Sequence, residues 1–92
     1  PKSLSFEVII ASVSCGAQHS GFITNEGHIF TFGSNTEGQL GIDDRNLNKS
    51  TAPLLVSSLL QTGQNAKKIV CGSYHTLILT NQNAVFTWGR NV

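Results

Sequence analysis

The stretch CGAQHSGFITNEGHIFTFGSN, residues Cys15–Asn35, returns later in the chain as CGSYHTLILTNQNAVFTWGRN, residues Cys71–Asn91. The second stretch starts 56 positions after the first (71 − 15), and the two align without a gap. Nine of the 21 aligned positions are identical, and most of the others exchange similar residues, as Phe32 does for Trp88. A repeat of this kind indicates a chain built from copies of one small structural unit.

Each copy contains the pattern of a β-hairpin. In the second copy, His75–Thr80 and Ala84–Trp88 are rich in β-branched and aromatic residues, and a short polar turn, Asn81–Asn83, separates them. The corresponding turn of the first copy is Asn25–Gly27. Asparagine is the next-best residue after glycine at a positive φ, so both copies are predicted to form the same hairpin turn.

Further strands are predicted on either side of the hairpins. A third strand precedes each hairpin, near Val13–Cys15 in the first copy and Lys68–Cys71 in the second, and a glycine ends it. A fourth strand is predicted at Ala52–Val56, with Pro53 close to its start. The repeated unit is therefore expected to be a four-stranded antiparallel sheet.

Apolar side chains fall on both faces of the predicted strands. Leu77 and Ile78 point to opposite faces, and so do Val85 and Phe86, because side chains alternate along a strand. A sheet with one solvent-exposed face would alternate apolar and polar residues more regularly. We therefore expect each sheet to be packed on both sides by neighbours, as the blades of a propeller are. The repeat is longer than the roughly 40–45 residues of WD-type blades and the roughly 50 of kelch blades.

The repeat resembles the regulator of chromosome condensation repeat family. In that family a Gly-x-x-His-Ser/Thr run is followed by a turn, by an aromatic-x-Trp-Gly-x-Asn segment and by a Gly-Gln-Leu-Gly loop. The resemblance covers residues 8–92, with Gly21, Phe32 and Asn83 as departures from the pattern. The matching residues with an expected structural role are Gly16, His19, Gly33, Gly38, Gln39, Leu40, Gly41, Gly72, His75, Trp88 and Gly89.

The resemblance implies an all-β fold made of β-propeller blades. The family propeller has seven blades, and this chain holds fewer than two repeats. We expect residues 1–92 to be a fragment of one propeller domain, with copies at about 13–56 and 69–92, the second incomplete. Because about three or more repeats are normally needed for stability, the remaining blades or other chains are expected to complete the fold.

The histidines and cysteines allow a structural and a chemical interpretation. His19 and His75 are predicted to be buried, with ring nitrogens that bond the backbone and tie adjacent strands, because a catalytic residue is not needed once per repeat. A zinc site formed with Cys15 and Cys71 is disfavoured, since neighbouring sheets lie about 10 Å apart. Both cysteines are expected to be small, buried, reduced thiols, which favours an intracellular protein, cytoplasmic or nuclear.

The loop Thr36–Ser50 is the candidate interaction site. It is polar and joins the two copies, and loops on rigid scaffolds often carry function. Its segment Gly33–Gly38 begins like a phosphate-binding loop, but Gln39-Leu40 follows instead of Lys-Ser/Thr, so that interpretation is rejected. The residues that could contact a partner are Glu37, Asp43, Asp44, Arg45 and Lys49.

Composition narrows the function. Charged residues make up 12 % of the chain and the formal net charge is +1, which disfavours direct binding to nucleic acid or attachment to chromatin. No run approaches the ~18 apolar residues of a membrane span, so no membrane partner is expected. There is no nucleophile–base pair, cofactor motif or metal motif, so the chain is not expected to be an enzyme.

The favoured function is a protein–protein interaction module within a larger scaffold or regulatory protein. The alternative, which the resemblance implies, is a guanine-nucleotide exchange factor for a small Ran-like GTPase.

Overall fold

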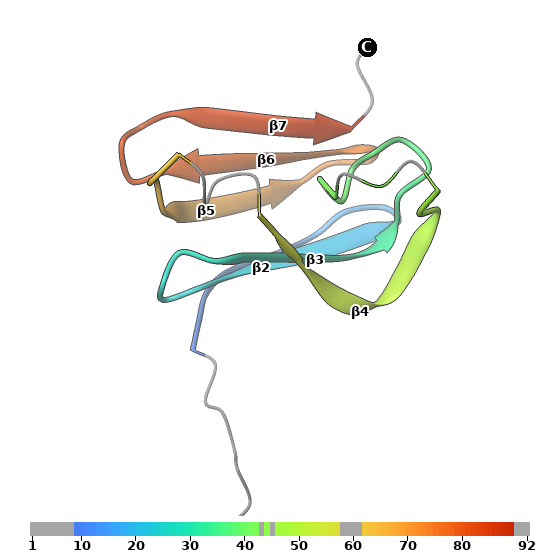
Figure 1. The fold of residues 1–92 in the computed structure, drawn as a ribbon, viewed down its shortest axis with the longest axis horizontal. Helices are drawn as coiled ribbons and strands as arrows, with labels where there is room; N and C mark the ends of the chain where they lie inside the picture. Colours follow the sequence, from blue (N-terminus) through green and yellow to red (C-terminus); the bar gives the residue numbers. More distant parts are fainter. Residues whose placement is uncertain (1–8, 43, 45, 58–61, 90–92) are drawn as a thin grey trace, which may run out of the picture.

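The chain folds into two antiparallel sheets that lie face to face (Figure 1). The computed structural model describes residues 9–42, 44, 46–57 and 62–89, and within them every regular element is a strand. Sheet A consists of β1 (Ile10–Cys15), β2 (His19–Thr24), β3 (Ile29–Ser34) and β4 (Lys49–Val56), in that order. Sheet B consists of β5 (Ala66–Cys71), β6 (His75–Thr80) and β7 (Val85–Gly89). The predicted all-β fold of antiparallel blades is confirmed.

The two hairpin turns have the same geometry. Gly27 has a φ of 84° and Asn83 a φ of 64°, so asparagine adopts the left-handed conformation that glycine adopts in the first copy. The backbone N–H of each donates to the carbonyl of the threonine that ends the preceding strand, Thr24 in one sheet and Thr80 in the other. The predicted equivalence of the two turns is confirmed.

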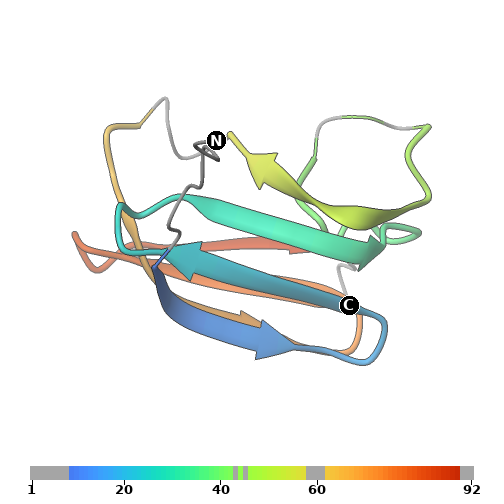
Figure 2. The same cartoon turned by 90° about the horizontal axis from the view of Figure 1, so that it is seen from below.

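Three strands begin earlier than the sequence predicts. β1 and β5 start at Ile10 and Ala66, and both contain a register shift near their start, which interrupts the alternation expected of a strand. β4 starts at Lys49, so Pro53 lies inside it and not at its start. β4 is the edge strand beside β3 (Figure 2), and the register between Thr31 and Gly33 is irregular opposite this proline. A proline is tolerated there because an edge strand or a bulge does not need its N–H.

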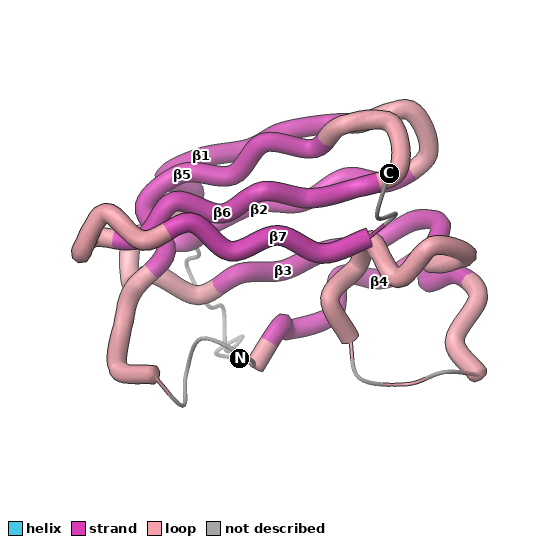
Figure 3. Tube along the Cα trace, turned by 90° about the horizontal axis from the view of Figure 1, so that it is seen from above, coloured by secondary structure: helices cyan, strands magenta, loops and turns pink. Residues whose placement is uncertain are grey.

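The core lies between the sheets. Sheet B covers one face of sheet A, with β5 next to β1 (Figure 3). We call the face of sheet A that sheet B covers its front, and the opposite face its back. The front of sheet B is the equivalent face in the second copy, so it is the back of sheet B that packs on the front of sheet A. The front of sheet A contributes Ile23, Ile29 and Val56, and the back of sheet B contributes Ile69, Cys71 and Ile78, with Phe86 and Trp88 packed against this cluster. Burial of these side chains is the main apolar contribution to the fold.

Serine hydroxyls add polar contacts to the same interface. The Oγ atoms of Ser12 and Ser14 in β1 accept hydrogen bonds from the backbone N–H groups of Ile69 (3.4 Å) and Cys71 (2.9 Å) in β5. β5 is an edge strand of sheet B, so these N–H groups have no neighbouring strand to bond. The serines therefore satisfy donors that the packing of the sheets would otherwise leave unpaired.

None of the described residues forms a helix long and apolar enough to cross a membrane.

Truncation of a core isoleucine is expected to destabilise the chain strongly. Ile78→Ala removes a side chain that has no exposed surface and leaves a cavity between the sheets, which costs about 2–5 kcal/mol in the free energy of unfolding. Ile9→Ala is the matched control, because Ile9 is 57 % exposed, and it should cost less than about 1 kcal/mol. Urea denaturation followed by circular dichroism measures both. Equal losses for the two variants would contradict the assignment of the core.

Candidate functional site

The segment Gly38–Gly41 passes between the two sheets, and we call it the clasp. After β3 the chain makes two successive turns, in which Gly38 N–H donates to Asn35 O (3.0 Å) and Gly41 N–H to Gly38 O (3.2 Å). The turns direct the side chains of Gln39 and Leu40 inward, where neither has exposed surface. Figure 1 shows the loop after β3 rising from sheet A towards sheet B.

Two threonines, one from each sheet, hold the clasp. Thr31 Oγ1 in β3 donates a hydrogen bond to the carbonyl oxygen of Leu40 at 2.8 Å. Thr76 Oγ1 in β6 donates to the carbonyl oxygen of Gln39 at 2.7 Å. Both hydroxyls are fully buried, so the bonds form away from competing water. Consecutive carbonyls of one loop are thus bound to two different sheets.

His19 extends this arrangement to a third partner. Its Nε2 lies 2.9 Å from Thr76 Oγ1 and 3.2 Å from the carbonyl oxygen of His75. Because the Thr76 hydroxyl donates to Gln39, its oxygen accepts from His19, which requires a proton on Nε2. His19 Nδ1 is buried and has no hydrogen-bond partner among the described residues. Burial lowers the pKa of His19 below its ordinary value of 6.5, although the bond to the His75 carbonyl opposes this shift.

This geometry modifies the predicted role of the histidines. His19 is buried and structural, but it ties two sheets together and not two strands of one sheet. The prediction that His75 is buried is wrong: its side chain is exposed, on the front of sheet B. Cys15 was likewise expected to be buried and is exposed, on the back of sheet A, whereas Cys71 is buried. The reason is the same in both cases, since no described segment covers these two faces.

The cysteines do not form a metal centre in the part of the chain that the structure describes. Both are free thiols, and burial raises the pKa of the Cys71 thiol. No group of three or more histidine, cysteine, aspartate or glutamate side chains within residues 9–42, 44, 46–57 and 62–89 could hold a metal ion.

The repeated glycines and Trp88 lie around the clasp and the histidines. Gly16 and Gly72 precede β2 and β6, and Gly33 and Gly89 pair with His19 and His75 in the sheet register. Gly41 lies against the indole ring: a Cβ placed on it would come within 2.9 Å of Trp88 Cδ2. Trp88 therefore packs on the clasp of the neighbouring sheet.

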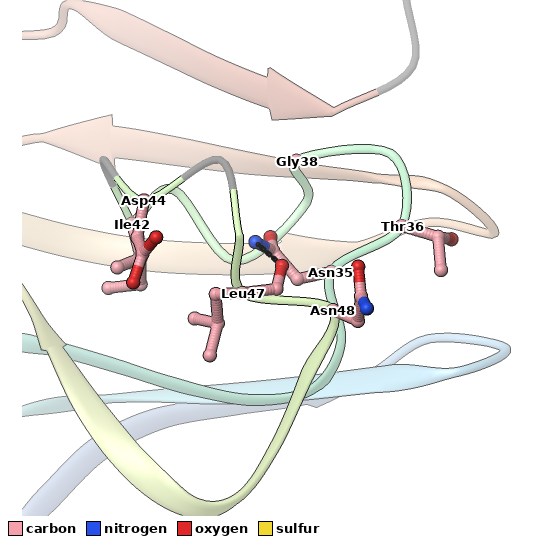
Figure 4. A pocket seen from close by; sticks show the side chains of 7 residues that line it. All are labelled: Asn35, Thr36, Gly38, Ile42, Asp44, Leu47 and Asn48. Carbon is pink, nitrogen blue, oxygen red and sulfur yellow. Dashed lines mark hydrogen bonds between the residues drawn. The ribbon is translucent and has the colours of Figure 1, made fainter.

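A hollow opens beside the clasp, and we call it the loop hollow (Figure 4). Its volume is about 290 Å³, and it is lined by Asn35, Thr36, Gly38, Ile42, Asp44, Leu47 and Asn48. Asn35 anchors both sides of it. Its Oδ1 accepts from Leu40 N–H (3.0 Å), its Nδ2 donates to Leu47 O (2.9 Å), and its backbone N–H donates to Asn48 O (2.7 Å). The hollow is thus attached directly to the clasp.

The predicted interaction residues divide between the hollow and its surroundings. Asp44 lines the hollow, and its Oδ1 accepts a hydrogen bond from Asn46 N–H at 3.0 Å. Glu37 is half-buried, and its backbone N–H donates to Gln39 Oε1 at 2.8 Å. Lys49 is exposed in β4, beyond the loop proper. Asp43 and Arg45 lie outside the described residues.

Other residues of the site carry weaker sequence signals or none. The hydroxyls of Thr31 and Thr76 were visible as repeated positions, since Thr87 and Ser20 occupy their places in the other copy. Their hydrogen bonds were not predicted, because the acceptors are backbone carbonyls of a distant loop. Ile42, Leu47 and Asn48 belong to no motif, and only the folded loop brings them together.

A methyl group added to Gly41 should destabilise the chain through Trp88. Gly38 and Gly41 have similar φ values, 76° and 72°, so alanine is strained equally at both positions. Gly38 has no atom within 4 Å of an added Cβ, whereas Gly41 has the Trp88 ring. Gly41→Ala should therefore lose about 1–3 kcal/mol more unfolding free energy than Gly38→Ala, and only Gly41→Ala should shift the fluorescence of Trp88. Equal losses, with fluorescence unchanged, would show that Trp88 does not pack on the clasp.

Acidification should destabilise the chain in a window that opens near pH 6.5. The unfolded chain protonates His19 around its ordinary pKa of 6.5, while folded His19, with its lowered pKa, stays neutral. Below pH 6.5 the unfolded state therefore binds more protons than the folded state. The free energy of unfolding has its full value above pH 6.5 and falls as the pH drops towards the pKa of His19 in the folded chain. Urea titrations between about pH 7.5 and 5.5 measure the slope.

His19→Gln is the variant for this titration, and it should reduce the slope relative to that of the unaltered chain. A slope that survives in His19→Gln would rule out His19 as its source.

Comparison with known proteins agrees with this architecture. Residues 26–79 match the regulator of chromosome condensation (RCC1) repeat, and residues 10–39 match a second description of the same repeat. The chain is 43 % identical over 83 residues to the serine/threonine-protein kinase Nek8 of Danio rerio, covering 90 % of this chain and 11 % of Nek8. It is 42 % identical over 90 residues to the human probable E3 ubiquitin-protein ligase HERC4, covering 98 % of this chain and 8 % of HERC4.

Solved structures share the arrangement of the sheets. Human WBSCR16 superposes with a TM-score of 0.81 at 26 % identity, over 96 % of this chain and 23 % of that one. Yeast RCC1 (Prp20), solved with Kap60, gives a TM-score of 0.80 at 20 % identity, over 95 % of this chain and 21 % of that one. The chain thus spans a small part of each protein it resembles. With two blades of the matching fold and a repeat match over more than half of its length, the chain belongs to the regulator of chromosome condensation (RCC1) repeat family.

Proposed function

We propose that the chain is a protein–protein interaction module of a larger protein and that the loop hollow contacts the partner. The observation that carries the proposal is the attachment of the hollow to the clasp through Asn35. A loop fixed in this way presents its side chains in one arrangement, which lowers the entropy lost on binding. The relatives support a role within a longer chain, because this chain covers only 11 % of Nek8 and 8 % of HERC4.

The lining of the hollow fits a segment of protein. Ile42 and Leu47 are half-buried and can contact an aliphatic side chain, while Asn48 and Thr36 offer hydrogen-bonding groups at the rim. Asp44 adds a carboxylate that a basic side chain could approach. A volume of about 290 Å³ is slightly smaller than the roughly 300–1,000 Å³ typical of small-molecule sites. We infer that the hollow receives one or two side chains of a partner.

The domain organisation belongs to the same proposal. We propose that residues 1–92 form part of one propeller domain, with copies at about 13–56 and 69–92, and that other blades complete it. We propose an intracellular location, cytoplasmic or nuclear, which is consistent with two free thiols. The kinase and ligase names of the relatives describe whole proteins, and we propose no such catalysis for this chain.

The second candidate is a guanine-nucleotide exchange factor for a small Ran-like GTPase. What favours it is the likeness to yeast Prp20p, whose binding properties to Gsp1p and histones were described with its structure, at a TM-score of 0.74 and 24 % identity. Exchange requires a surface that stabilises the nucleotide-free GTPase and no catalytic triad, so the absence of a reactive motif does not oppose it. A shared fold does not by itself transfer the activity.

Binding experiments with charge-altered variants test the first candidate. The chain is used as bait, captured proteins are identified by mass spectrometry, and the dissociation constant of each purified candidate is measured by calorimetry. Thr36→Arg and Asp44→Lys alter two exposed residues of the hollow. Each should raise the dissociation constant of the partner at least tenfold, which corresponds to about 1.4 kcal/mol of binding free energy. Glu26→Lys is the matched control, since it makes the same charge reversal in the hairpin turn at the other end of sheet A.

Nucleotide release separates the two candidates. A Ran-like GTPase loaded with a fluorescent nucleotide is mixed with the chain, and the loss of fluorescence is followed. Accelerated release supports exchange, and an unchanged rate together with a hollow-dependent partner supports the interaction module. Partners that bind Thr36→Arg, Asp44→Lys and the unaltered chain equally well would contradict the role of the hollow.

A further inference from the structure

Two polar atoms buried at the clasp have no hydrogen-bond partner among the described residues. They are Nδ1 of His19 and Nε2 of Gln39. His19 is 2 % exposed and Gln39 has no exposed surface, so bulk water does not reach either atom. About nine in ten buried polar groups in folded proteins are hydrogen-bonded, to protein or to ordered water. Two unpaired atoms at one junction therefore indicate a small bound ligand.

The hydrogen bonds around His19 determine what its unpaired nitrogen can do. Nε2 must carry a proton, because the Thr76 hydroxyl that it contacts at 2.9 Å already donates to the carbonyl oxygen of Gln39. A neutral imidazole has one ring proton, so Nδ1 is left as a hydrogen-bond acceptor. Burial lowers the pKa of His19, which keeps the ring in this neutral form at pH 7.

The side-chain amide of Gln39 is also fixed in orientation. Its Oε1 accepts a hydrogen bond from the backbone N–H of Glu37 at 2.8 Å. An amide turned the other way would place its NH₂ group against that N–H, so that two donors faced each other. Nε2 is therefore the unpaired atom and it is a donor. The clasp thus holds one buried donor and one buried acceptor, which are complementary.

The two residues converge on the same hydroxyl. His19 Nε2 and the Gln39 carbonyl oxygen lie 2.9 Å and 2.7 Å from Thr76 Oγ1. The unpaired atoms do not bond each other directly. A single water molecule, with each of its bonds about 2.7–3.0 Å long, joins polar atoms that are about 4.5–5.5 Å apart.

The chemistry of the two atoms selects the ligand. A cation would be repelled by the Gln39 N–H, and an anion would be repelled by the lone pair of His19 Nδ1. Water donates and accepts at once, and it is the smallest molecule that does so. Buried waters in proteins typically make two to four hydrogen bonds to groups that are otherwise unpaired.

We propose that one buried water molecule bridges the clasp to β2, accepting a hydrogen bond from Gln39 Nε2 and donating one to His19 Nδ1. Neither residue lines the loop hollow, so the proposal does not rest on the proposed function. The water adds a polar link between sheet A and the clasp. It also stabilises the neutral form of His19, because a protonated Nδ1 could no longer accept its hydrogen bond.

Nuclear magnetic resonance spectra of the unaltered chain test the proposal. A buried water stays long enough to give nuclear Overhauser cross-peaks with nearby protons, and rotating-frame spectra distinguish these from chemical exchange. The amide protons of Gln39 and the ring proton on Cε1 of His19 should both show such a cross-peak at the water frequency. Nitrogen-15 spectra should show His19 protonated at Nε2. A folded chain without these cross-peaks, or with His19 protonated at Nδ1, would overturn the proposal.

A pair of glutamine variants locates the water. Gln39→Met keeps the length of the side chain and removes the donor, whereas Gln82→Met makes the same change in the exposed hairpin turn of sheet B. Oxygen-17 relaxation dispersion counts long-lived waters, and the count should fall by one in Gln39→Met and stay the same in Gln82→Met. A folded Gln39→Met chain that keeps the full count and the His19 cross-peak would contradict a water held by Gln39. The spectra of the unaltered chain remain decisive if Gln39→Met does not fold.

Discussion

The structure depends on the hydrogen bonds that join the clasp to both sheets. Thr31 donates to Leu40 O and Thr76 donates to Gln39 O, so adjacent carbonyls of one loop are bound to different blades. His19 bonds the Thr76 hydroxyl as well. If one of these partners is removed, a buried polar group loses its bond, and such a group is costly to leave unpaired. The apolar core supplies the attraction between the sheets, and the clasp determines how they are aligned.

The sequence repeat and the structural blade are offset from each other. The family match over residues 26–79 starts in the turn before β3 and ends in β6, so one sequence repeat contains β3 and β4 of sheet A, the clasp, and β5 with most of β6 of sheet B. A repeat of this kind connects its neighbours by covalent chain as well as by packing. This offset also explains why the loop hollow lies beside the contact between blades. There the side chain of Asn35 bonds Leu40 in the clasp and Leu47 on the opposite side of the loop.

Local features of the fold could be predicted from the sequence, whereas features set by contacts between sheets could not. The hairpins and the positive φ of Asn83 follow from strand alternation and turn chemistry, which depend on neighbouring residues. The exposure of Cys15 and His75 was mispredicted because burial depends on which faces another sheet covers. The residues of the hollow, such as Leu47, belong to no repeated pattern, so only the folded loop identifies them.

The most direct test of the clasp compares Thr76→Val with Thr87→Val in urea denaturation. Both changes remove one hydroxyl from sheet B and keep the size of the side chain. Thr76 is fully buried between His19 and the Gln39 carbonyl, while Thr87 is exposed. The account predicts that Thr76→Val lowers the free energy of unfolding by about 1–3 kcal/mol and that Thr87→Val changes it by less than about 0.5 kcal/mol. Equal changes in the two variants would contradict the claim that the clasp joins the blades.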